Sequence, residues 1–133
     1  MTREILQPEG WLAPRGYSNG MAASGRIVVT AGQVGWDPHT GVIVSADFAE
    51  QAAQALRNLV DVLRAGGARP EHVVRLTWYI TNRESYVAAR AAIGEAYRAI
   101  MGRNYPPMSV VIVRGLIERD ADVEIEATAV IPE

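Results

Sequence analysis

Few side chains in this 133-residue sequence could act chemically on a substrate. All 13 basic residues are arginine, and 15 Asp and Glu residues outnumber them, so the formal net charge is −2. The chain has no lysine and no cysteine, which excludes Schiff-base and thiolate nucleophiles, disulfides and Cys-ligated zinc. Its two histidines, His39 and His72, form no HExxH pair, and no GxSxG motif is present. A Ser-His-Asp triad is possible in principle, and the charged groups available to bind a ligand are arginines and carboxylates.

The distribution of charge and hydropathy limits the partners that we expect. The slightly acidic balance argues against nucleic-acid binding, which needs clustered positive charge. The first residues, MTREILQPEGW, lack the apolar stretch of a signal peptide, and no apolar run approaches 18 residues. We expect a cytoplasmic protein with no membrane or nucleic-acid partner, no metal and no cofactor.

The length of the chain fits one domain over residues 1–133. Two segments of it have helical periodicity and must help to position the arginines and carboxylates. Apolar residues recur every three or four positions in the first segment, which predicts a helix over 47–65 with Asp47 as its N-cap. A second helix is predicted over 83–101, with Thr81 as its cap and Gly102 at its end. The apolar face of the first helix consists of Phe48, Ala52, Leu56, Leu59 and Leu63.

Runs of β-branched residues predict the strands. They cover residues 27–31, 73–81, 109–114 and 123–131, and shorter extended pieces are expected around 3–6 and 18–23. Alternation places every second residue on one face of a strand. The predicted helix-facing sets are Val74, Leu76, Trp78 and Ile80 in one strand, and Val123, Ile125, Ala127, Ala129 and Ile131 in the last.

The order of elements predicts an α+β fold, a mixed β-sheet with two helices packed on one face. The opposite face then has no covering element. It is either solvated or meets another copy of the chain, and its apolar residues Val111, Val113 and Val130 favour self-association.

Five ordered pieces of the sequence resemble the RidA (YjgF-type) enamine/imine deaminase family. They are Gly16-Tyr17-Ser18, the run from Ile27 to Gly35, Asp37-Pro38-x-Thr40-Gly41, the residues Gln51, Gln54, Ala55, Leu56 and Asn58 of the first helix with Ala65-Gly66 at its end, and the closing Val123 to Val130 segment. The resemblance implies a chorismate-mutase-like fold, a homotrimer and clefts between the subunits. It also implies hydrolysis of reactive enamines or imines to keto acids and ammonia.

By this resemblance, the cleft is built from Tyr17, the backbone of Gly32 and Gln33, and a Pro-x-Arg segment before the fifth strand. Glu126 supplies a carboxylate, the candidate catalytic group. In such a site the guanidinium would hold a substrate carboxylate by two parallel hydrogen bonds, and a water near a carboxylate would add to the imine carbon.

The sequence departs from the family pattern at the expected arginine. Met108 stands there, and Val110 occupies the position two further on that is often cysteine. Arg114 follows six residues later, roughly 20 Å along an extended strand, and so cannot replace it. Arg26, Arg75 or an arginine of a neighbouring subunit remain alternatives.

Two functions stay open for a cleft that includes Met108 and Val110. One is enamine/imine hydrolysis with an altered substrate preference, and the other is a non-catalytic trimer that binds a small molecule or has a regulatory role. The ribonuclease activity often attached to this family is disfavoured by the acidic balance, the absence of lysine and the lack of a catalytic His pair.

Overall fold

The structure is a computed structural model that describes residues 3–133. The first predicted helix forms in it as α1 (Phe48–Ala65), where the apolar spacing predicts it. Asp47 is its N-cap, because its carboxylate accepts a hydrogen bond from the backbone N–H of Glu50 at 3.0 Å. Leu56, Leu59 and Leu63 on the predicted face are fully buried. The periodicity and the cap are both confirmed.

The second predicted helix is in fact two, so the prediction of one continuous helix was wrong. They are α2 (Arg83–Ala88) and α3 (Arg90–Met101), which meet at Ala89, where φ is −93° and ψ is 1°. The N-cap is also not Thr81. Asn82 caps α2 by accepting from the N–H of Ser85 at 2.9 Å, while the Thr81 hydroxyl reaches the Asp122 carboxylate at 3.4 Å. The turn at Ala89 redirects the chain so that α3 packs against α1.

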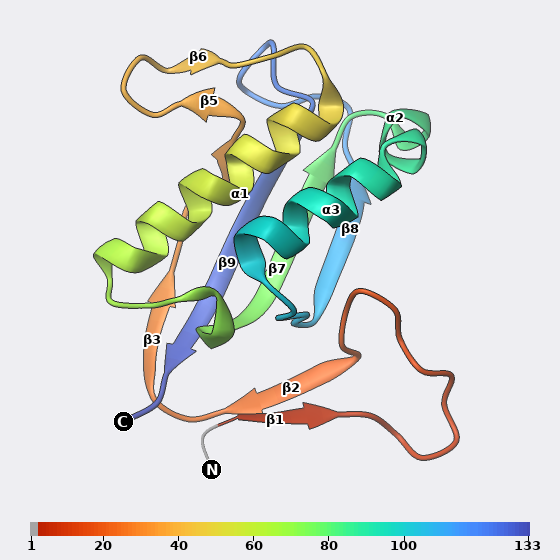
Figure 1. Cartoon of the computed structure of the whole chain (residues 1–133), viewed down its shortest axis with the longest axis vertical. Helices are drawn as coiled ribbons and strands as arrows, with labels where there is room; N and C mark the ends of the chain where they lie inside the picture. The colour runs from red at the N-terminus through yellow and green to blue at the C-terminus, as the bar shows by residue number, and fades with distance from the viewer. Residues whose placement is uncertain (1–2) are drawn as a thin grey trace.

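The main sheet is mixed, as predicted, and carries the helices on one face (Figure 1). Its strand order is β3 (Arg26–Val29), β9 (Val123–Ile131), β7 (Val73–Ile80) and β8 (Met108–Ile112), and β4 (Gln33–Val34) also pairs with β9. The β7–β8 pair is parallel and the other pairs are antiparallel. The structure confirms the α+β class.

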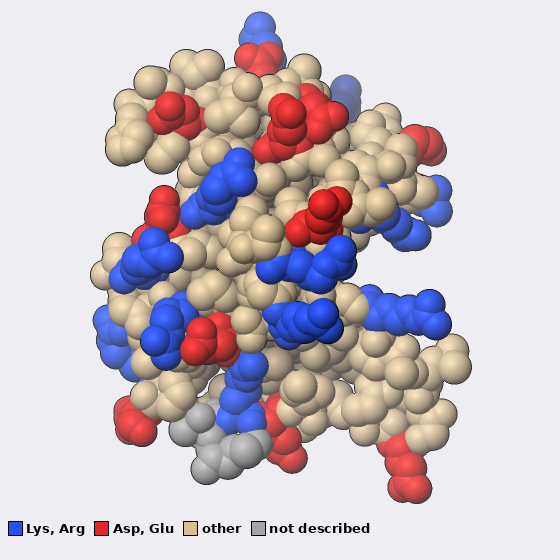
Figure 2. All heavy atoms as spheres, in the orientation of Figure 1, with Lys and Arg blue, Asp and Glu red and all other residues tan. Residues whose placement is uncertain are grey.

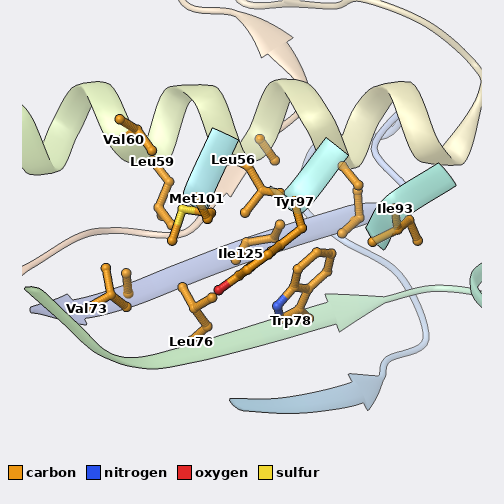
Figure 3. Close-up of a cluster of buried hydrophobic side chains, with 14 of the residues drawn as sticks. Leu56, Leu59, Val60, Val73, Leu76, Trp78, Ile93, Tyr97, Met101 and Ile125 are labelled. Carbon is orange, nitrogen blue, oxygen red and sulfur yellow. The ribbon is translucent and has the colours of Figure 1, made fainter. Parts of the chain in front are cut away.

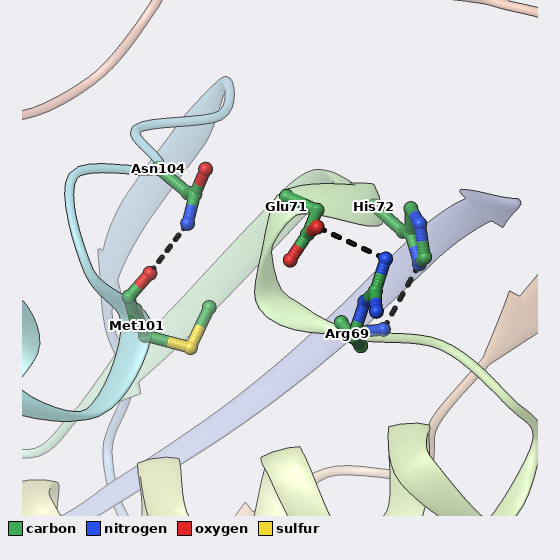
Figure 4. Close-up of polar contacts among 5 residues, drawn as sticks. All are labelled: Arg69, Glu71, His72, Met101 and Asn104. Atoms are coloured by element: carbon green, nitrogen blue, oxygen red, sulfur yellow. Dashed lines mark hydrogen bonds and ion pairs between the residues drawn. The ribbon is translucent and has the colours of Figure 1, made fainter.

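Two small strand pairs and one short turn lie outside this sheet. The hairpin of β1 (Arg3–Leu6) and β2 (Gly20–Ala23) crosses one end of the sheet, and β5 (Trp36–Asp37) pairs with β6 (Val42–Ile43). A short 3-10 turn, η1 (Pro70–His72), precedes β7. In this turn the Arg69 backbone N–H donates to Nδ1 of His72 at 3.0 Å, and the Arg69 guanidinium pairs with Glu71 at 3.2 Å (Figure 4). These contacts give His72 a structural role.

The core lies between the helices and the sheet (Figure 3). Leu76, Trp78 and Ile80 of β7 face it as predicted, but Val74 does not. The β7–β9 register shifts between Val73 and Arg75, and such a bulge moves the following residue to the other face. Val73 is therefore the buried residue, and Val74 lines a hollow beside Arg75 on the opposite face.

The opposite face of the sheet, which we call the outer face, has no helix packed on it within residues 3–133. Ile27, Val29 and Val111 lie on it with 68%, 67% and 42% of their surface exposed. Glu124, Glu126, Thr77 and Tyr79 share this face by register. None of the helices in residues 3–133 is both long and apolar enough to span a membrane.

Candidate functional site

A cavity of about 530 Å³ lies between the N-terminal segment, α3 and the start of β8. Figure 2 shows a recess at the right-hand edge of the molecule, with basic side chains above and below it. Five aromatic and three arginine side chains line the cavity, together with two glycines, Ile93 and Met108. The aromatic residues are Tyr17, Trp78, Tyr86, Tyr97 and Tyr105, and the arginines are Arg15, Arg90 and Arg98.

Ser18 fixes Tyr17 at this cavity. The buried Ser18 hydroxyl donates to the Tyr105 carbonyl at 2.5 Å, and the Ser18 N–H donates to the Pro106 carbonyl at 3.3 Å. Because both acceptors immediately precede β8, the two bonds hold the N-terminal segment over the beginning of that strand. The neighbouring Tyr17 and the first β8 residue, Met108, consequently line the same cavity.

A second set of polar contacts fixes the loop that joins α3 to β8. The Tyr97 hydroxyl donates to the Asn104 carbonyl, and the Asn104 side-chain amide donates to the Met101 carbonyl at 2.7 Å (Figure 4). The Tyr97 ring also stacks on Tyr105, with 5.4 Å between centroids and 13° between planes. Burial raises the pKa of Tyr97, and Tyr105 adds to this effect, so the phenol stays protonated and serves as a fixed donor.

Only two of the six predicted site residues line this cavity, Tyr17 and Met108. Within one chain, Gly32, Gln33, Val110 and Glu126 are not among its walls. The register explains the separation of the two central residues. Met108 pairs with Leu76 on the helix-facing side of the sheet, whereas Glu126 pairs with Thr77 on the outer face.

Gly32 and Gln33 lie at the β4 edge of the sheet, next to the outer-face carboxylates. A side chain at Gly32 would overlap the Glu124 carboxylate, so the close approach expected of this glycine is toward Glu124. The Gln33 side-chain amide donates to the Ala31 carbonyl at 3.3 Å. Val110 follows Met108 along β8 and is 39% exposed.

Glu126 has Tyr79 as its titratable neighbour on the outer face. Burial raises the pKa of the Tyr79 phenol, and the negative charges of Glu126 and Glu124 raise it further. Arg75 acts in the opposite direction and lowers this pKa, so Glu126 lies in a patch of mixed charge with Glu124 and Arg75. That patch is on the other side of the sheet from the cavity.

Two of the three alternatives to the missing arginine, Arg26 and Arg75, belong to this chain and can now be placed. The Arg26 guanidinium donates to the Gly66 carbonyl at 2.6 Å, which holds it at the end of α1. Arg75 lines a separate hollow of about 520 Å³ on the outer face. Neither residue lines the Tyr17–Met108 cavity.

The arginines that do line this cavity, Arg15, Arg90 and Arg98, were missed by the sequence reasoning. A signal was present, because Arg90, Gly94 and Arg98 follow one another at intervals of four residues. Such spacing places them along one stripe of a helix.

Known proteins agree with this architecture. A family model described as Endoribonuclease L-PSP matches residues 11–131. A conserved Rid-family protein of unknown function from Yersinia pestis superposes with a TM-score of 0.85 at 36% identity, covering 98% of this chain and 100% of that one. The chain belongs to the RidA (YjgF-type) family.

Some relatives of this RidA-family chain are named only by their family, and others are named by an activity. A RutC-family protein from Synechocystis is 36% identical over 134 residues, covering 99% of both chains. The human 2-iminobutanoate/2-iminopropanoate deaminase is 31% identical over 105 residues, covering 79% of this chain and 73% of its own. Within residues 3–133 of this RidA-family chain, no cluster of three His, Asp or Glu side chains could hold a metal ion.

Proposed function

We propose that this protein hydrolyses a reactive enamine or imine in the Tyr17–Met108 cavity, with residues 1–133 acting as one RidA-like domain. Water adds to the carbon of the C=N bond, the C–N bond then breaks, and the products are a carbonyl compound and ammonia. The observation that carries the proposal is the meeting of Tyr17 and Met108 in one cavity. The family's named deaminases support the reaction type.

We further propose that the working unit is a homotrimer with clefts between its subunits. The exposed Ile27, Val29 and Val111 support an outer face that another copy covers. This arrangement also bears on catalysis, because Glu126 lies on that face. Glu126 can act as the catalytic carboxylate only where a neighbouring copy brings a ligand-binding wall against it.

Met108 changes which substrates such a site would accept. A thioether has no charge and donates no hydrogen bond, so the carboxylate of a small α-imino acid would lack its usual partner. A partly desolvated carboxylate that lies at position 108, away from the arginines of α3, is left unpaired at a cost of roughly 2–5 kcal/mol. Since about 1.4 kcal/mol is tenfold, we expect kcat/KM for 2-iminopropanoate to be lower by about 30- to several-thousand-fold than with the arginine present.

The experiment compares keto-acid release by the natural protein, Met108→Arg and Met108→Arg/Glu126→Gln. Methionine and arginine have similar unbranched stems, so the guanidinium can follow the same path into the cavity. We expect the single variant to gain hydrolysis of 2-iminopropanoate and the double variant to lose it. If neither variant turns over any imine while both remain folded, the hydrolase proposal is wrong.

A second candidate is a binding or regulatory protein that uses the same cavity without catalysis. The observation that favours it is the absence of any carboxylate among the cavity's lining residues in the described chain. Such a protein would show ligand-dependent thermal stabilisation but no keto-acid release in any assembly state. Measuring both ligand binding and keto-acid release for the same variants separates the two candidates.

A further inference from the structure

We propose that the cavity recognises a carboxylate with a flat, apolar body, and that Arg90 and Arg98 of α3 bind the carboxylate in place of the arginine missing at position 108. This inference rests on the proposed function for the location of the site and for the carboxylate of the substrate. It adds the residues that bind the anion and the shape of the ligand.

The first support is a set of positive charges without acidic partners. Within residues 3–133, the ion pairs are Arg64–Asp61 and Arg69–Glu71, and neither involves a cavity arginine. No Asp or Glu lines the cavity, so Arg15, Arg90 and Arg98 meet there without a neutralising group. All three are solvent-exposed, so their guanidinium groups are accessible to an anionic ligand. Guanidinium groups bind carboxylates through paired hydrogen bonds.

The second support is the geometry of α3. Arg90 and Arg98 are two turns apart on one stripe, about 12 Å along the helix axis, with Gly94 midway between them. Side chains on a helix lean toward its N-terminus, and Nη1 of Arg98 lies 3.5 Å from the position that a Gly94 Cβ would take. The Arg98 guanidinium therefore extends back over Gly94, toward Arg90.

Gly94 itself has no backbone reason to be a glycine. Its φ is not positive, and glycine within a helix is less stable than alanine. Because Gly94 lines the cavity, its missing side chain keeps open the space beneath the Arg98 guanidinium. A helix residue that is unfavourable for folding but leaves room for a ligand is typical of a binding site.

The third support is the apolar part of the wall, which fits a flat ring. Tyr97 and Tyr105 stack nearly parallel, and the Arg90 guanidinium lies 5.9 Å from the centroid of the Tyr86 ring, a cation–π contact that restrains it. The Trp78 side chain also lines the cavity, and its buried indole N–H has no acceptor within residues 3–133. A buried donor without a partner is costly, and a ligand oxygen or nitrogen would satisfy it.

These features together favour an aryl-substituted imino acid, or the keto acid formed from it, over a small aliphatic one. The carboxylate would lie at α3 and the ring among the tyrosines. The reacting carbon would then point toward Tyr17 and Met108.

The test uses two unreactive probes of nearly the same shape, the anion phenylacetate and the neutral phenylacetamide, in calorimetric titrations of the natural protein. We expect phenylacetate to bind at least tenfold more tightly. Arg90→Gln and Arg98→Gln should each weaken phenylacetate binding about tenfold and leave phenylacetamide unchanged. Arg64→Gln, an exposed α1 residue outside the cavity, is the control and should change neither affinity.

A separate variant, Gly94→Ala, tests the space beneath Arg98. We expect its melting temperature to rise by about 2–5 °C, because alanine favours the helix, while both probes bind more weakly. A rise in stability with unchanged binding would show that Gly94 does not serve the ligand.

The outcomes separate this inference from the proposed function. Charge-dependent binding that the arginine variants abolish, without turnover of any imine, would uphold the inference and reject the hydrolase. Imine turnover with KM values for aryl substrates that are unchanged in both arginine variants would reject the inference and uphold the hydrolase. Equal binding of the two probes, or binding of neither by the natural protein, would also overturn the inference.

Discussion

The two faces of the sheet are built from the same strands but have opposite characters. Along β9, Val123, Ile125 and Ala129 face the helices and are fully buried, whereas the alternating Glu124 and Glu126 are only partly buried on the outer face. The helix-facing side is completed within one chain by α1 and α3, except where the cavity remains. Within residues 3–133, the outer face has apolar and acidic residues and no helix packed on it, and the β1–β2 hairpin meets it only at one end of the sheet.

This difference shows which parts of the function a single chain can supply. One chain holds the aromatic and arginine walls of the cavity, but its candidate catalytic carboxylate is on the other side of the sheet. Assembly is the step that could join them. The following experiments test the contrast between the two faces, starting with the largest expected effect.

Assembly should depend on the outer face. We expect Val111→Arg to convert a trimer into monomers, because a guanidinium would be buried without a partner at the proposed interface. Sedimentation equilibrium at micromolar concentration measures the mass. The control is Ile117→Arg in an exposed loop, which should leave the mass unchanged. A monomeric mass for the natural protein would instead favour a solvated outer face.

Chain stability should depend on the helix-facing side. Val123 is fully buried and Val29 is 67% exposed, so the same truncation compares the two faces. Val123→Ala should lower the free energy of unfolding by about 2 kcal/mol, through lost apolar burial and a cavity. Val29→Ala should cost less, and by an amount that depends on protein concentration if the face is an interface. Urea unfolding at two concentrations measures both, and equal, concentration-independent losses would contradict the contrast.

Alkaline pH should weaken the fold through Tyr97, beneath the cavity. Burial raises the pKa of this phenol in the folded state above the ordinary value of about 10. Its contribution is therefore fully present below pH 10 and is lost as the pH rises further, by up to about 1.4 kcal/mol per pH unit. Tyr97→Phe should have a lower free energy of unfolding than the natural protein at pH 8, because the substitution removes the hydrogen bond to Asn104. Above pH 10 the free energy of unfolding of the variant should fall less steeply. Parallel declines in urea unfolding would contradict this.

The pKa of Tyr79 provides a corresponding test on the outer face. Glu126→Gln should lower the pKa of Tyr79, because one of the negative charges that favour its protonated form is removed. The pKa of Tyr97, across the sheet, should not move. Tyrosine resonances followed by NMR against pH report both groups, and a shift in Tyr97 alone would show that the two faces are wrongly assigned.

Much of the fold is encoded in local patterns that can be recognised without the structure. The apolar stripe and Asp47 cap of α1, the alternation of β9 and the end of α3 at Gly102 depend on residues close together in sequence. The turn at Ala89 was not predicted, since the apolar spacing continues across it. Nor was the bulge that exchanges Val73 and Val74, because it arises from pairing with β9.

The site depended far more on tertiary structure. The sequence alone determined which residue types could serve, the absence of an arginine at Met108 and the family resemblance. Only the packed structure brought Arg15, Arg90 and Arg98 to the cavity of Tyr17 and Met108, and only the strand register placed Glu126 on the other face. The physical reason is that a residue's own periodicity decides which residues share its face, whereas the neighbours it meets are decided by strand pairing and helix packing between distant segments.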